Sequence, residues 1–493
     1  MQVIRLPNQF LGLHLLKNIK KIKSIANSIL VLYWRLALFG KTQHIHIIGI
    51  GGAGLSGIAE VLLDLDFDVT GSDIVKSTAT EHLKACGAKI WYGHASSQVN
   101  GADVVVMSPA IPEDNPELQA AMLAKIPIIR GAEMLNEITR MRYSVAVSGT
   151  HGKTTTTAMT AAVLATLDPT VVVGGKLVNG SNARSGHGDV MVIEADEAYG
   201  SIEMFYPTIA VVTSVDADHL DYYNNVEEIG KTFLTFINKV PFYGSAVLCL
   251  DQENIQKLIP QVEKKFITYG LETRADLIAE EIKIDGPTSH YQVRMNDEVY
   301  GNVHLKMPGR HNIANSLAAI AVGLELEIPF EKIQGALESF QGVHRRFEVL
   351  GTVDNIVVVD DYAHNPAKLM AALRGAREGY NRRIVAVFQP HRYARVRDLA
   401  DEFSRSFYQA DVLIVTSIYG AGEEPIENVT GENLARAIEA HGHTHVIYES
   451  DMDEAVERLM QITRPNDLVI TLGAGDVVNV GHKFLSKRAS KIR

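Results

Sequence analysis

The sequence predicts an α/β protein of three consecutive domains, and three observations support this fold class. Short apolar runs alternate with helical segments along most of the chain, as they do in parallel sheets covered by helices. Two of these runs end in a glycine-rich turn that opens a helix. At 493 residues the chain is also too long for one ordinary hydrophobic core. We place the domain boundaries near residues 142 and 345, after a basic extension at 1–42.

Composition and charge exclude several classes of protein. Hydrophobic residues make up 46% and charged residues 21%, which is ordinary for folded domains and excludes a disordered chain. A net charge of −11 offers no broad basic surface for phosphates, so nucleic acid is not an expected partner. Two cysteines, Cys86 and Cys249, are too few for a disulfide framework or a cysteine metal cluster. They suit a reducing compartment, and we expect a cytoplasmic protein.

Residues 1–42 contain seven basic residues and no acidic one. The most apolar stretch, 25–39, is too short and too interrupted by polar residues to span a bilayer. No small-residue cleavage site of a secretory signal follows it. Three hypotheses stay open for this extension: a poorly ordered segment or a start codon assigned too early, a basic helix on an anionic membrane surface, and a transit peptide.

The first domain, 43–142, opens with a glycine-rich turn. The turn G-I-G-G-A-G at 49–54 lies between an expected strand at 44–49 and an expected helix at 54–66. Glycines there let the backbone approach a pyrophosphate, which the helix N-terminus binds. Asp73 ends the next strand, where a ribose-binding acid would lie. The pattern favours a Rossmann-like nucleotide site, although glycines that serve only helix–strand packing would look the same.

The second domain, 143–345, begins with a strand at 144–148 that runs into S-G-T-H-G-K-T-T-T-T. Val147 stands where the Walker pattern has its first glycine, but the residues that bind phosphate and metal in that pattern are present. Backbone N–H groups from Gly149 to Thr154 can hold phosphates, Lys153 can reach the β- and γ-phosphates, and the Thr154 hydroxyl can bind Mg²⁺. The motif predicts a central P-loop domain that resembles an ATPase.

Acidic residues follow two further strands of this domain. Glu194-Ala195-Asp196-Glu197 ends the strand at 190–194, and Asp216-Ala217-Asp218-His219 follows the strand at 209–213. The carboxyl ends of parallel strands collect ligands, and Mg²⁺ prefers hard oxygen ligands. His219 alone is more typical of an ordinary loop histidine.

Two other features of the second domain are less specific. Residues 276–307 alternate like antiparallel strands and predict a β-ribbon. The segment 308–315, P-G-R-H-N-I-A-N, enters an alanine-rich helix. Its asparagines could bind an adenine edge or cap the helix.

The third domain, 346–493, repeats the α/β pattern. Strands are expected at 356–360, 384–388, 412–416 and 468–472. Clusters of Arg, His, Tyr and Asp at 345–347, 360–366 and 388–395 adjoin these strands and should gather at one rim of the sheet. Arginine there suits bidentate binding of carboxylate or phosphate, and the alternative is a solvated rim without function.

Together these motifs resemble the Mur ligase family of peptidoglycan synthesis, and most closely its branch that adds L-alanine. The resemblance extends from about His44 to Phe484 and rests on G-I-G-G-A-G-L-S-G at 49–57, G-T-H-G-K-T-T-T at 149–156, E-A-D-E at 194–197, D-A-D-H-L-D at 216–221, D-D-Y-A-H-N-P at 360–366, F-Q-P-H-R-Y at 388–393, Y-G-A-G-E-E-P-I at 419–426 and L-G-A-G-D at 472–476. It implies a Rossmann-like UDP-sugar domain, a central domain for Mg-ATP, and a C-terminal Rossmann-like α/β domain that closes over ATP and the amino acid.

The resemblance also implies an activity. L-Alanine would be ligated to the lactoyl carboxylate of UDP-N-acetylmuramate through an acyl phosphate, with ATP as co-substrate, Mg²⁺ as cofactor, and ADP and phosphate as products. Monomer and dimer stay open. Three alternatives are a nicotinamide-dependent dehydrogenase, a P-loop switch without ligase activity, and the family branch that recycles an alanine-containing tripeptide.

The family's functional residues map onto this chain in five overlapping sets. The UDP-sugar set is Gly49, Gly51, Gly52, Ala53, Gly54, Ser72, Asp73 and His151, and the ATP set is Gly149, Thr150, Gly152, Lys153, Thr154, Thr155, Asn315, Arg346 and Asp361. The amino-acid set is Tyr362, His364, Arg392 and Arg395, the metal set is Thr154, Glu194 and His219, and the catalytic set is Lys153, His219, Glu194, His364 and Arg395. Asn365 departs from the pattern, since many members of the branch have a second histidine there.

Overall fold

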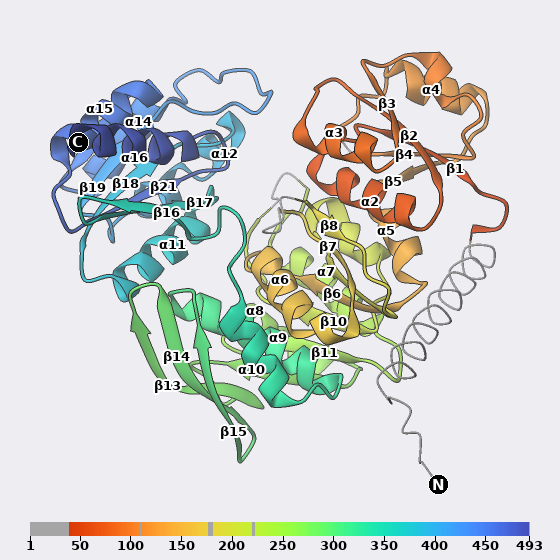
Figure 1. Ribbon diagram of the computed structural model, residues 1–493, viewed down its shortest axis with the longest axis horizontal. Coiled ribbons are helices and arrows are strands. Elements are labelled where there is room, and N and C mark those ends of the chain that lie inside the picture. The colour runs from red at the N-terminus through yellow and green to blue at the C-terminus, as the bar shows by residue number, and fades with distance from the viewer. Residues whose placement is uncertain (1–38, 109, 176–180, 219–221, 493) are drawn as a thin grey trace, which may run out of the picture.

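The computed structural model describes residues 39–492 apart from 109, 176–180 and 219–221. Three sheets of five, ten and six strands follow one another along the chain, each flanked by helices (Figure 1). The three-domain α/β fold class is therefore confirmed. Within the described ranges no helix is long and apolar enough to cross a membrane. The basic extension lies outside these ranges up to residue 38.

The first sheet is parallel, with the strand order β3-β2-β1-β4-β5. Its order reverses between β1 and β4, and in open α/β sheets ligands bind at the carboxyl ends beside such a reversal. The glycine-rich turn lies there, between β1 and α2. The elements are β1 (His44–Ile48), α2 (Ala53–Asp64), β2 (Asp68–Asp73), α3 (Thr78–Ala85), β3 (Lys89–Tyr92), the 3-10 helix η1 (Ser96–Val99), β4 (Val104–Met107), α4 (Pro116–Leu123), β5 (Ile128–Arg130) and α5 (Gly131–Thr139).

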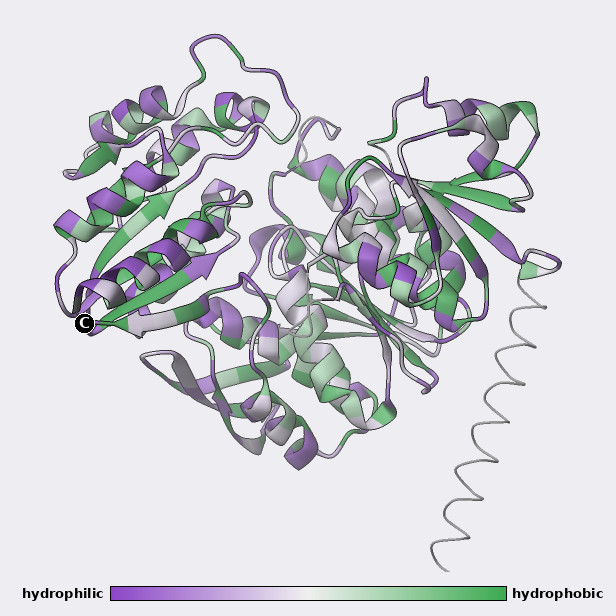
Figure 2. Ribbon diagram, turned by 45° about the horizontal axis from the view of Figure 1, so that its top comes forward, coloured by the Kyte–Doolittle hydropathy of each residue, from purple (hydrophilic) through white to green (hydrophobic). Residues whose placement is uncertain are grey.

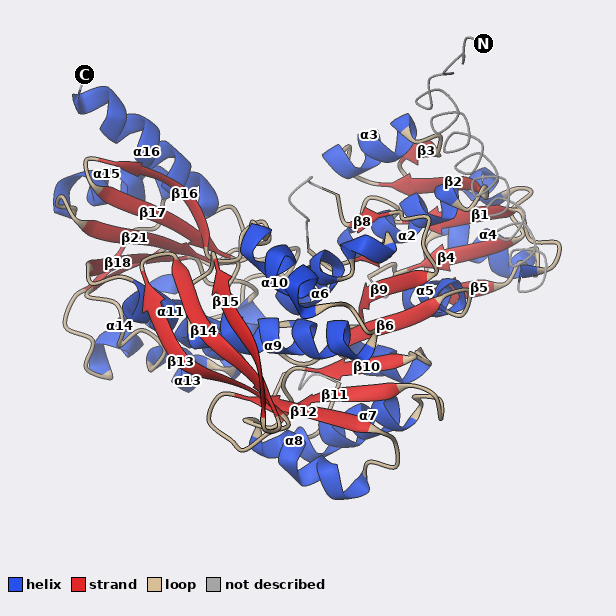
Figure 3. Ribbon diagram, turned by 60° about the horizontal axis from the view of Figure 1, so that its bottom comes forward, coloured by secondary structure: helices blue, strands red, loops and turns tan. Residues whose placement is uncertain are grey.

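The central sheet has the order β15-β14-β13-β12-β11-β10-β6-β9-β7-β8. The predicted ribbon is confirmed, but it continues the sheet rather than decorating it, because β13 pairs in parallel with β12 before β14 and β15 run antiparallel (Figure 3). The strands are β6 (Tyr143–Ser148), β7 (Thr170–Val172), β8 (Ala183–Arg184), β9 (Val190–Glu194), β10 (Ile209–Val212), β11 (Ser245–Cys249), β12 (Phe266–Gly270), β13 (Leu277–Asp285), β14 (Thr288–Met295) and β15 (Glu298–Leu305). The helices are α6 (Lys153–Val163), α7 (Val226–Asn238), α8 (Glu253–Leu258), α9 (Arg310–Glu325) and α10 (Phe330–Ser339), with 3-10 turns η2 (Ala165–Leu167), η3 (Ala198–Met204) and η4 (Ile259–Gln261).

The third sheet has the order β16-β17-β21-β18-β19-β20, parallel except for the edge strand β16. The central residues of its inner strands are apolar because helices cover both faces. The elements are β16 (Glu348–Val353), β17 (Ile356–Asp361), α11 (Pro366–Gly379), β18 (Arg383–Phe388), α12 (Tyr393–Asp398), α13 (Ala400–Ser404), β19 (Val412–Val415), α14 (Gly431–Ala440), β20 (Val446–Tyr448), α15 (Met452–Ile462), β21 (Asp467–Leu472) and α16 (Val478–Ile492).

The first two domains share one hydrophobic core, whereas the third has its own. A single cluster of buried side chains runs from the first sheet into the central one. Many residues of the strands in both sheets have the hydrophobic colour in Figure 2. Gly57 of α2 permits this junction, because a Cβ there would lie 3.3 Å from the Asn182 carbonyl oxygen beside β8. The third domain is therefore the one whose packing leaves it freest to move.

Candidate active site

The P-loop connects β6 to α6 and depends on two glycines with positive φ. Gly149 has a φ of +135° and Gly152 of +81°. A Cβ on Gly149 would collide with Thr213, and one on Gly152 with the Asn315 side chain. The N–H groups of Thr150 and His151 donate to the carbonyl and hydroxyl oxygens of Ser214, at 3.1 and 2.8 Å. These two N–H groups are therefore used within the protein, and the groups that could hold a phosphate are the other N–H groups of the loop and the N-terminus of α6.

Lys153 is a fixed cation at the start of α6. Its Nζ lies 2.6 Å from Glu197 Oε2 and 3.4 Å from Asp196 Oδ1. Burial lowers the pKa of Lys153, but the two carboxylates outweigh it and hold the pKa above its usual value. Burial raises the pKa of Glu197, against the pull of the lysine. The acidic motif at the end of β9 therefore keeps the P-loop lysine charged and in place.

Thr154 and Glu194, two of the expected metal ligands, lie side by side. The Thr154 hydroxyl donates to Glu194 Oε1 at 2.9 Å, and Glu194 Oε2 accepts the Gly174 N–H at 2.7 Å. A hydroxyl and a carboxylate next to a phosphate loop are the hard oxygen donors that suit Mg²⁺. His219 lies outside the described residues. Among the described ones no group of three His, Cys, Asp or Glu could hold a metal.

Asn315, the expected adenine contact, packs against the P-loop helix. It lies on α9, is buried, and its Oδ1 accepts the Thr156 hydroxyl at 3.1 Å. Its amide nitrogen donates to Asn312 Oδ1 at 3.4 Å. The segment at 308–315 is thus part of the nucleotide side of the molecule, although its side chains are also joined to each other.

Arg346 crosses from the third domain to the P-loop. Its Nη2 donates to the Thr154 hydroxyl at 3.4 Å, and its guanidinium lies over the Tyr362 ring at 5.3 Å. Asp361 holds the adjoining backbone, because its carboxylate accepts the N–H groups of Phe347 and Ala363, both at 2.8 Å. Burial raises the pKa of Asp361 to about 6, although the nearby Arg346 charge opposes this. The third domain therefore brings a cation to the P-loop.

The neighbouring Arg345 has a different role. It has a φ of +58°, and its guanidinium donates to Asp360 at 2.8 Å and to the carbonyl oxygens of Gly473 and Gly475. Its donors are used to join the start of the third domain to the L-G-A-G-D segment. The donors of Arg345 are thus occupied within the protein, and ligand binding by the arginines of this rim stays a prediction, with Arg346 as the residue placed for it.

The residues expected around the amino acid form an aromatic and cationic cluster. The His364 ring lies 5.3 Å from that of Tyr362 and 6.0 Å from that of His391. Arg395 Nη1 lies 3.3 Å from His391 Nδ1. Burial lowers the pKa of His364 well below its usual value, and the charges of Lys368 and Arg395 act in the same direction. The imidazole is neutral at physiological pH and can accept or donate a hydrogen bond.

Arg392 and Tyr419 lie at the edge of this cluster. Arg392 is the N-cap of α12, with a φ of +68°, and its side chain is exposed, whereas Arg395 is partly buried. The helix α12 begins at Tyr393, so Arg392 lies outside it and Arg395 within it. Tyr419, from the Y-G-A-G segment, stacks on His391 with ring centres 5.5 Å apart, a contact the sequence analysis did not find.

In the first domain, Asp73 organises the glycine turn. Its Oδ2 accepts the Gly51 N–H at 2.8 Å and its Oδ1 accepts the Val75 N–H at 3.0 Å. The Gly49 N–H donates to the Ser72 carbonyl oxygen at 2.8 Å, and Gly49 has a φ of +78°. Gly52 and Gly54 complete the turn into α2. The expected UDP-sugar residues on this turn are thus adjacent in space.

A buried polar network behind this turn was missed by the sequence analysis. Glu117, fully buried, accepts the Ser72 hydroxyl at 2.6 Å, and its Oε2 lies 3.4 Å from both His46 Nε2 and His94 Nδ1. Burial raises the pKa of Glu117, but the hydrogen bonds from His46 and Ser72 bring it below its ordinary value. The only signal in the sequence was His46, a polar residue inside an apolar strand.

His151, expected at the UDP-sugar, faces the acidic loop after β10. Its Nε2 lies 3.4 Å from Asp216 Oδ2. Burial lowers the pKa of His151 to about 4, with the charge of Lys368 acting in the same direction. We interpret the contact as a neutral imidazole that donates to the carboxylate.

Asn365 joins two domains. Its amide nitrogen donates to Asp218 Oδ2 of the central domain at 3.2 Å, and its Oδ1 accepts the Lys368 N–H at 3.0 Å, which caps α11. This gives the departing residue of the D-D-Y-A-H-N-P motif a structural role. Asp218 lies in D-A-D-H, so the two motifs meet across the domain boundary.

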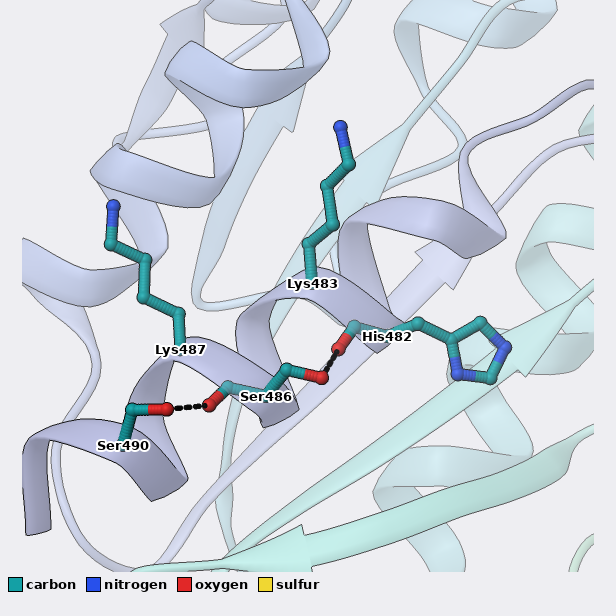
Figure 4. A pocket seen from close by; sticks show the side chains of 5 residues that line it. All are labelled: His482, Lys483, Ser486, Lys487 and Ser490. Atoms are coloured by element: carbon teal, nitrogen blue, oxygen red, sulfur yellow. Dashed lines mark hydrogen bonds between the residues drawn. The ribbon is translucent and has the colours of Figure 1, made fainter. Parts of the chain in front are cut away.

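A hollow on α16 is unrelated to these residues. It has a volume of about 410 Å³ and is lined by His482, Lys483, Ser486, Lys487 and Ser490. Figure 4 shows these side chains along one helix, with Ser486 donating to the His482 carbonyl oxygen. Lys483 and Lys487 pair with Asp453 and Glu457 of α15. These ion pairs account for the charges of the hollow.

A P-loop, acidic strand ends and a third domain that reaches the phosphate site define an ATP-dependent ligase of three domains. Three family models match the chain: "Mur ligase family, catalytic domain" at residues 44–143, "Mur ligase middle domain" at 147–323, and "Mur ligase, glutamate ligase domain" at 345–475. The chain belongs to the Mur ligase family. The dehydrogenase and the P-loop switch do not agree with this membership.

Similar proteins come from several bacteria. The UDP-N-acetylmuramate–L-alanine ligase of Geotalea uraniireducens is 51% identical over 91% of this chain and 99% of its own length. That of Desulfatibacillum aliphaticivorans is 51% identical over 92% of this chain and 100% of its length. The crystal structure of the UDP-N-acetylmuramate–alanine ligase of Thermotoga maritima has a TM-score of 0.76 and 30% identity, and covers 91% of this chain and 99% of its own.

Proposed function

We propose that this chain is an ATP-dependent ligase that joins L-alanine to the lactoyl carboxylate of UDP-N-acetylmuramate in peptidoglycan precursor synthesis. The products are ADP, phosphate and UDP-N-acetylmuramoyl-L-alanine. The observation that supports this most directly is the contact of Arg346 with Thr154, because it brings the amino-acid cluster of the third domain to the phosphate loop. Relatives about half identical over nearly the whole chain have this activity in their names.

The reaction needs activation because a carboxylate is a poor electrophile. The lactoyl carboxylate attacks the γ-phosphorus of ATP, the bond to ADP breaks, and an acyl phosphate forms. The alanine amine then attacks the acyl carbon, and phosphate leaves from the tetrahedral intermediate. Lys153 and Arg346 stabilise the charge of the transferring phosphoryl group, which is mainly a matter of position and electrostatics.

Residues of each domain have separate roles in this proposal. The turn at 49–54 with Ser72, Asp73 and His151 holds the UDP-sugar, and the P-loop with Thr155, Asn315 and Asp361 holds ATP. Thr154, Glu194 and His219 hold Mg²⁺, which supplies Lewis-acid neutralisation of phosphate charge when bound. Arg395 binds the alanine carboxylate, and Tyr362, His364 and Arg392 bound the amino-acid site. Closure of the third domain excludes water that would hydrolyse the acyl phosphate.

An ADP-release assay tests this function. Purified protein with UDP-N-acetylmuramate, Mg-ATP and a panel of amino acids should release ADP fastest with L-alanine. The competing substrate is the alanine-containing tripeptide of the recycling branch. Faster ADP release with the tripeptide than with L-alanine would replace the proposed acceptor, and ADP release that no amino acid stimulates would refute ligation.

A further inference from the structure

The first turn of α11 brings a second lysine, Lys368, into electrostatic range of the P-loop. The start of this helix is held by Asn365, which caps it and also donates to Asp218 of the central domain. Lys368 is the third residue of the helix, so its position is fixed by the same contact that joins the two domains. The charge of Lys368 acts on His151 and on His364, on opposite sides of the domain boundary.

The Lys368 ammonium group lies among charges of both signs, and it shares its carboxylates with other groups. Positive groups from both domains, Lys153 and Arg346, act on it, together with the carboxylates of Asp218 and Glu197. Glu197 already binds Lys153 at 2.6 Å, and Asp218 accepts the Asn365 amide. Among the residues that the structure describes, none forms a hydrogen bond or an ion pair with the Lys368 ammonium.

Burial lowers the pKa of Lys368 to about 8, and the nearby Lys153 charge acts in the same direction. Lys368 is partly buried, and a desolvated cation without an ion-pair partner is costly, a cost that is reduced when an anion arrives beside it. Three cations from two domains, Lys153, Arg346 and Lys368, thus lie within electrostatic range of one another at the domain boundary that Asn365 and Asp218 join. Such an arrangement suits a ligand with several negative charges.

We propose that Lys368 is a phosphate-binding residue, which contacts the γ-phosphate of ATP and then the acyl phosphate when the third domain closes. The inference rests on the proposed ligase function. The transferring phosphoryl group spreads negative charge over its peripheral oxygens, and a cation aimed there lowers the barrier. Since Lys368 belongs to the third domain, its charge is supplied only in the closed arrangement, which couples closure to chemistry.

The experiment compares Lys368→Gln with Lys368→Arg. Glutamine removes the charge at similar length, whereas arginine keeps the charge and cannot act as a base at any working pH. We expect Lys368→Gln to lower kcat about tenfold or more while the KM for alanine stays within about twofold. Lys368→Arg should keep at least about a third of kcat. Lys332→Gln, on the exposed face of α10, is the matched control and should behave as wild type.

Equilibrium binding gives a readout apart from turnover. With Mg²⁺ and UDP-N-acetylmuramate present, Lys368→Gln should bind β,γ-methylene-ATP at least about fivefold more weakly than wild type, and Lys368→Arg should not. Thermal unfolding establishes that each variant is folded.

Three results would overturn the proposal. In the first, Lys368→Gln keeps more than half of kcat and binds the analogue normally, so that the lysine is only a neighbour of the site. In the second, both variants are folded and equally inactive, which would make Lys368 a base for the alanine amine rather than a fixed charge. In the third, neither variant is folded, so that the side chain is needed for structure. If wild type releases no ADP with alanine, the ligase function itself fails, and this outcome is distinguishable because it does not involve the variants.

Discussion

The Arg346 guanidinium of the third domain lies 3.4 Å from the Thr154 hydroxyl of the P-loop. Thr154 also donates to Glu194, so one hydroxyl connects the acidic end of β9 to a cation from a domain with a separate core. The described structure therefore brings groups from the central and third domains to one hydroxyl, where they could act on the same phosphoryl group. Its consequences can be tested one side chain at a time.

Lys153→Ala should lower kcat by about 10³-fold or more, because a preorganised charge on the transferring group is lost. It should also reduce the free energy of unfolding, because the buried Glu197 carboxylate would lose the ion pair with the Lys153 ammonium. Adding Glu197→Gln should recover stability but not activity. Steady-state kinetics and thermal unfolding of the single and double variants measure both effects. A single variant with more than a few per cent of wild-type rate would contradict the assignment of Lys153.

Glu194→Ala should raise the Mg²⁺ concentration needed for half-maximal activity, about tenfold or more, since a carboxylate ligand is removed. The measurement is a magnesium titration at fixed total ATP. Glu203→Ala, on an exposed position of η3, provides the control and should leave the titration unchanged. An unaltered magnesium dependence in the Glu194 variant would remove this residue from the metal site.

Arg395→Lys should raise the KM for alanine far more than the KM for ATP. The ammonium cannot reproduce the two parallel hydrogen bonds that a guanidinium offers to a carboxylate. Glycine should replace alanine with a loss of about 1–3 kcal/mol of transition-state binding, measured from kcat/KM, because one missing methyl group discriminates only weakly between substrates. Arg397→Lys, two residues along and exposed, is the control. Equal effects on both KM values would assign Arg395 to the phosphate site instead.

Acid should destabilise the protein through its buried histidines. Burial lowers the pKa of His311 to about 4, and an unfolded histidine titrates near 6.5. The unfolded chain therefore binds more protons between these values, so the contribution of His311 to stability is full above about pH 6.5 and falls toward pH 4. His311 packs between Gly309 and Gly375 of α11, where the central and third domains touch.

The pH effect of His311 can be isolated by difference. His311→Gln keeps a polar side chain that does not titrate, so the gap in melting temperature between pH 7.5 and pH 5 should be smaller than in wild type. His151 and His391, whose pKa values burial also lowers to about 4, remain in both proteins and cancel. An unchanged gap would show that the native His311 titrates normally.

Deleting residues 1–38 should leave ligase activity and stability unchanged. Phe39 should be kept, because its ring packs edge-on against Phe67 at 5.1 Å. Deletion through residue 40 should therefore give an active protein with a lower melting temperature. Loss of activity in a folded 39–493 chain would show that the extension takes part in the reaction.

Much of the fold was predictable because buried parallel strands are short apolar runs. The strand Val190–Glu194 was predicted with the bounds it has, and the antiparallel ribbon within a few residues. The P-loop was predictable because Gly149 and Gly152 need backbone angles that other residues avoid. These features depend on local chemistry and spacing.

The rest depends on contacts between residues that are distant in the sequence. Glu117 accepts a hydrogen bond from the Ser72 hydroxyl, 45 positions away in the sequence, and the residues adjacent to Glu117 in the sequence do not indicate this contact. Arg345 and Arg346 are adjacent and chemically identical, yet the first is bound to Gly473 and Gly475 and the second reaches Thr154. The positive φ of Arg345 turns the backbone between them, so the two side chains reach different partners, and this backbone conformation is set by the tertiary fold.

The shared core of the first two domains bears on how the chain acquires its structure during synthesis. Strands β1 to β5 leave the ribosome before β7 and β8, which α2 packs against through Gly57, so a nascent first domain exposes an apolar helix face until about residue 184 has emerged. The third domain can bury its apolar residues without the other two, since its buried clusters are formed within residues 347–485. Translation therefore divides this protein into an early unit of two sheets and a late unit of one.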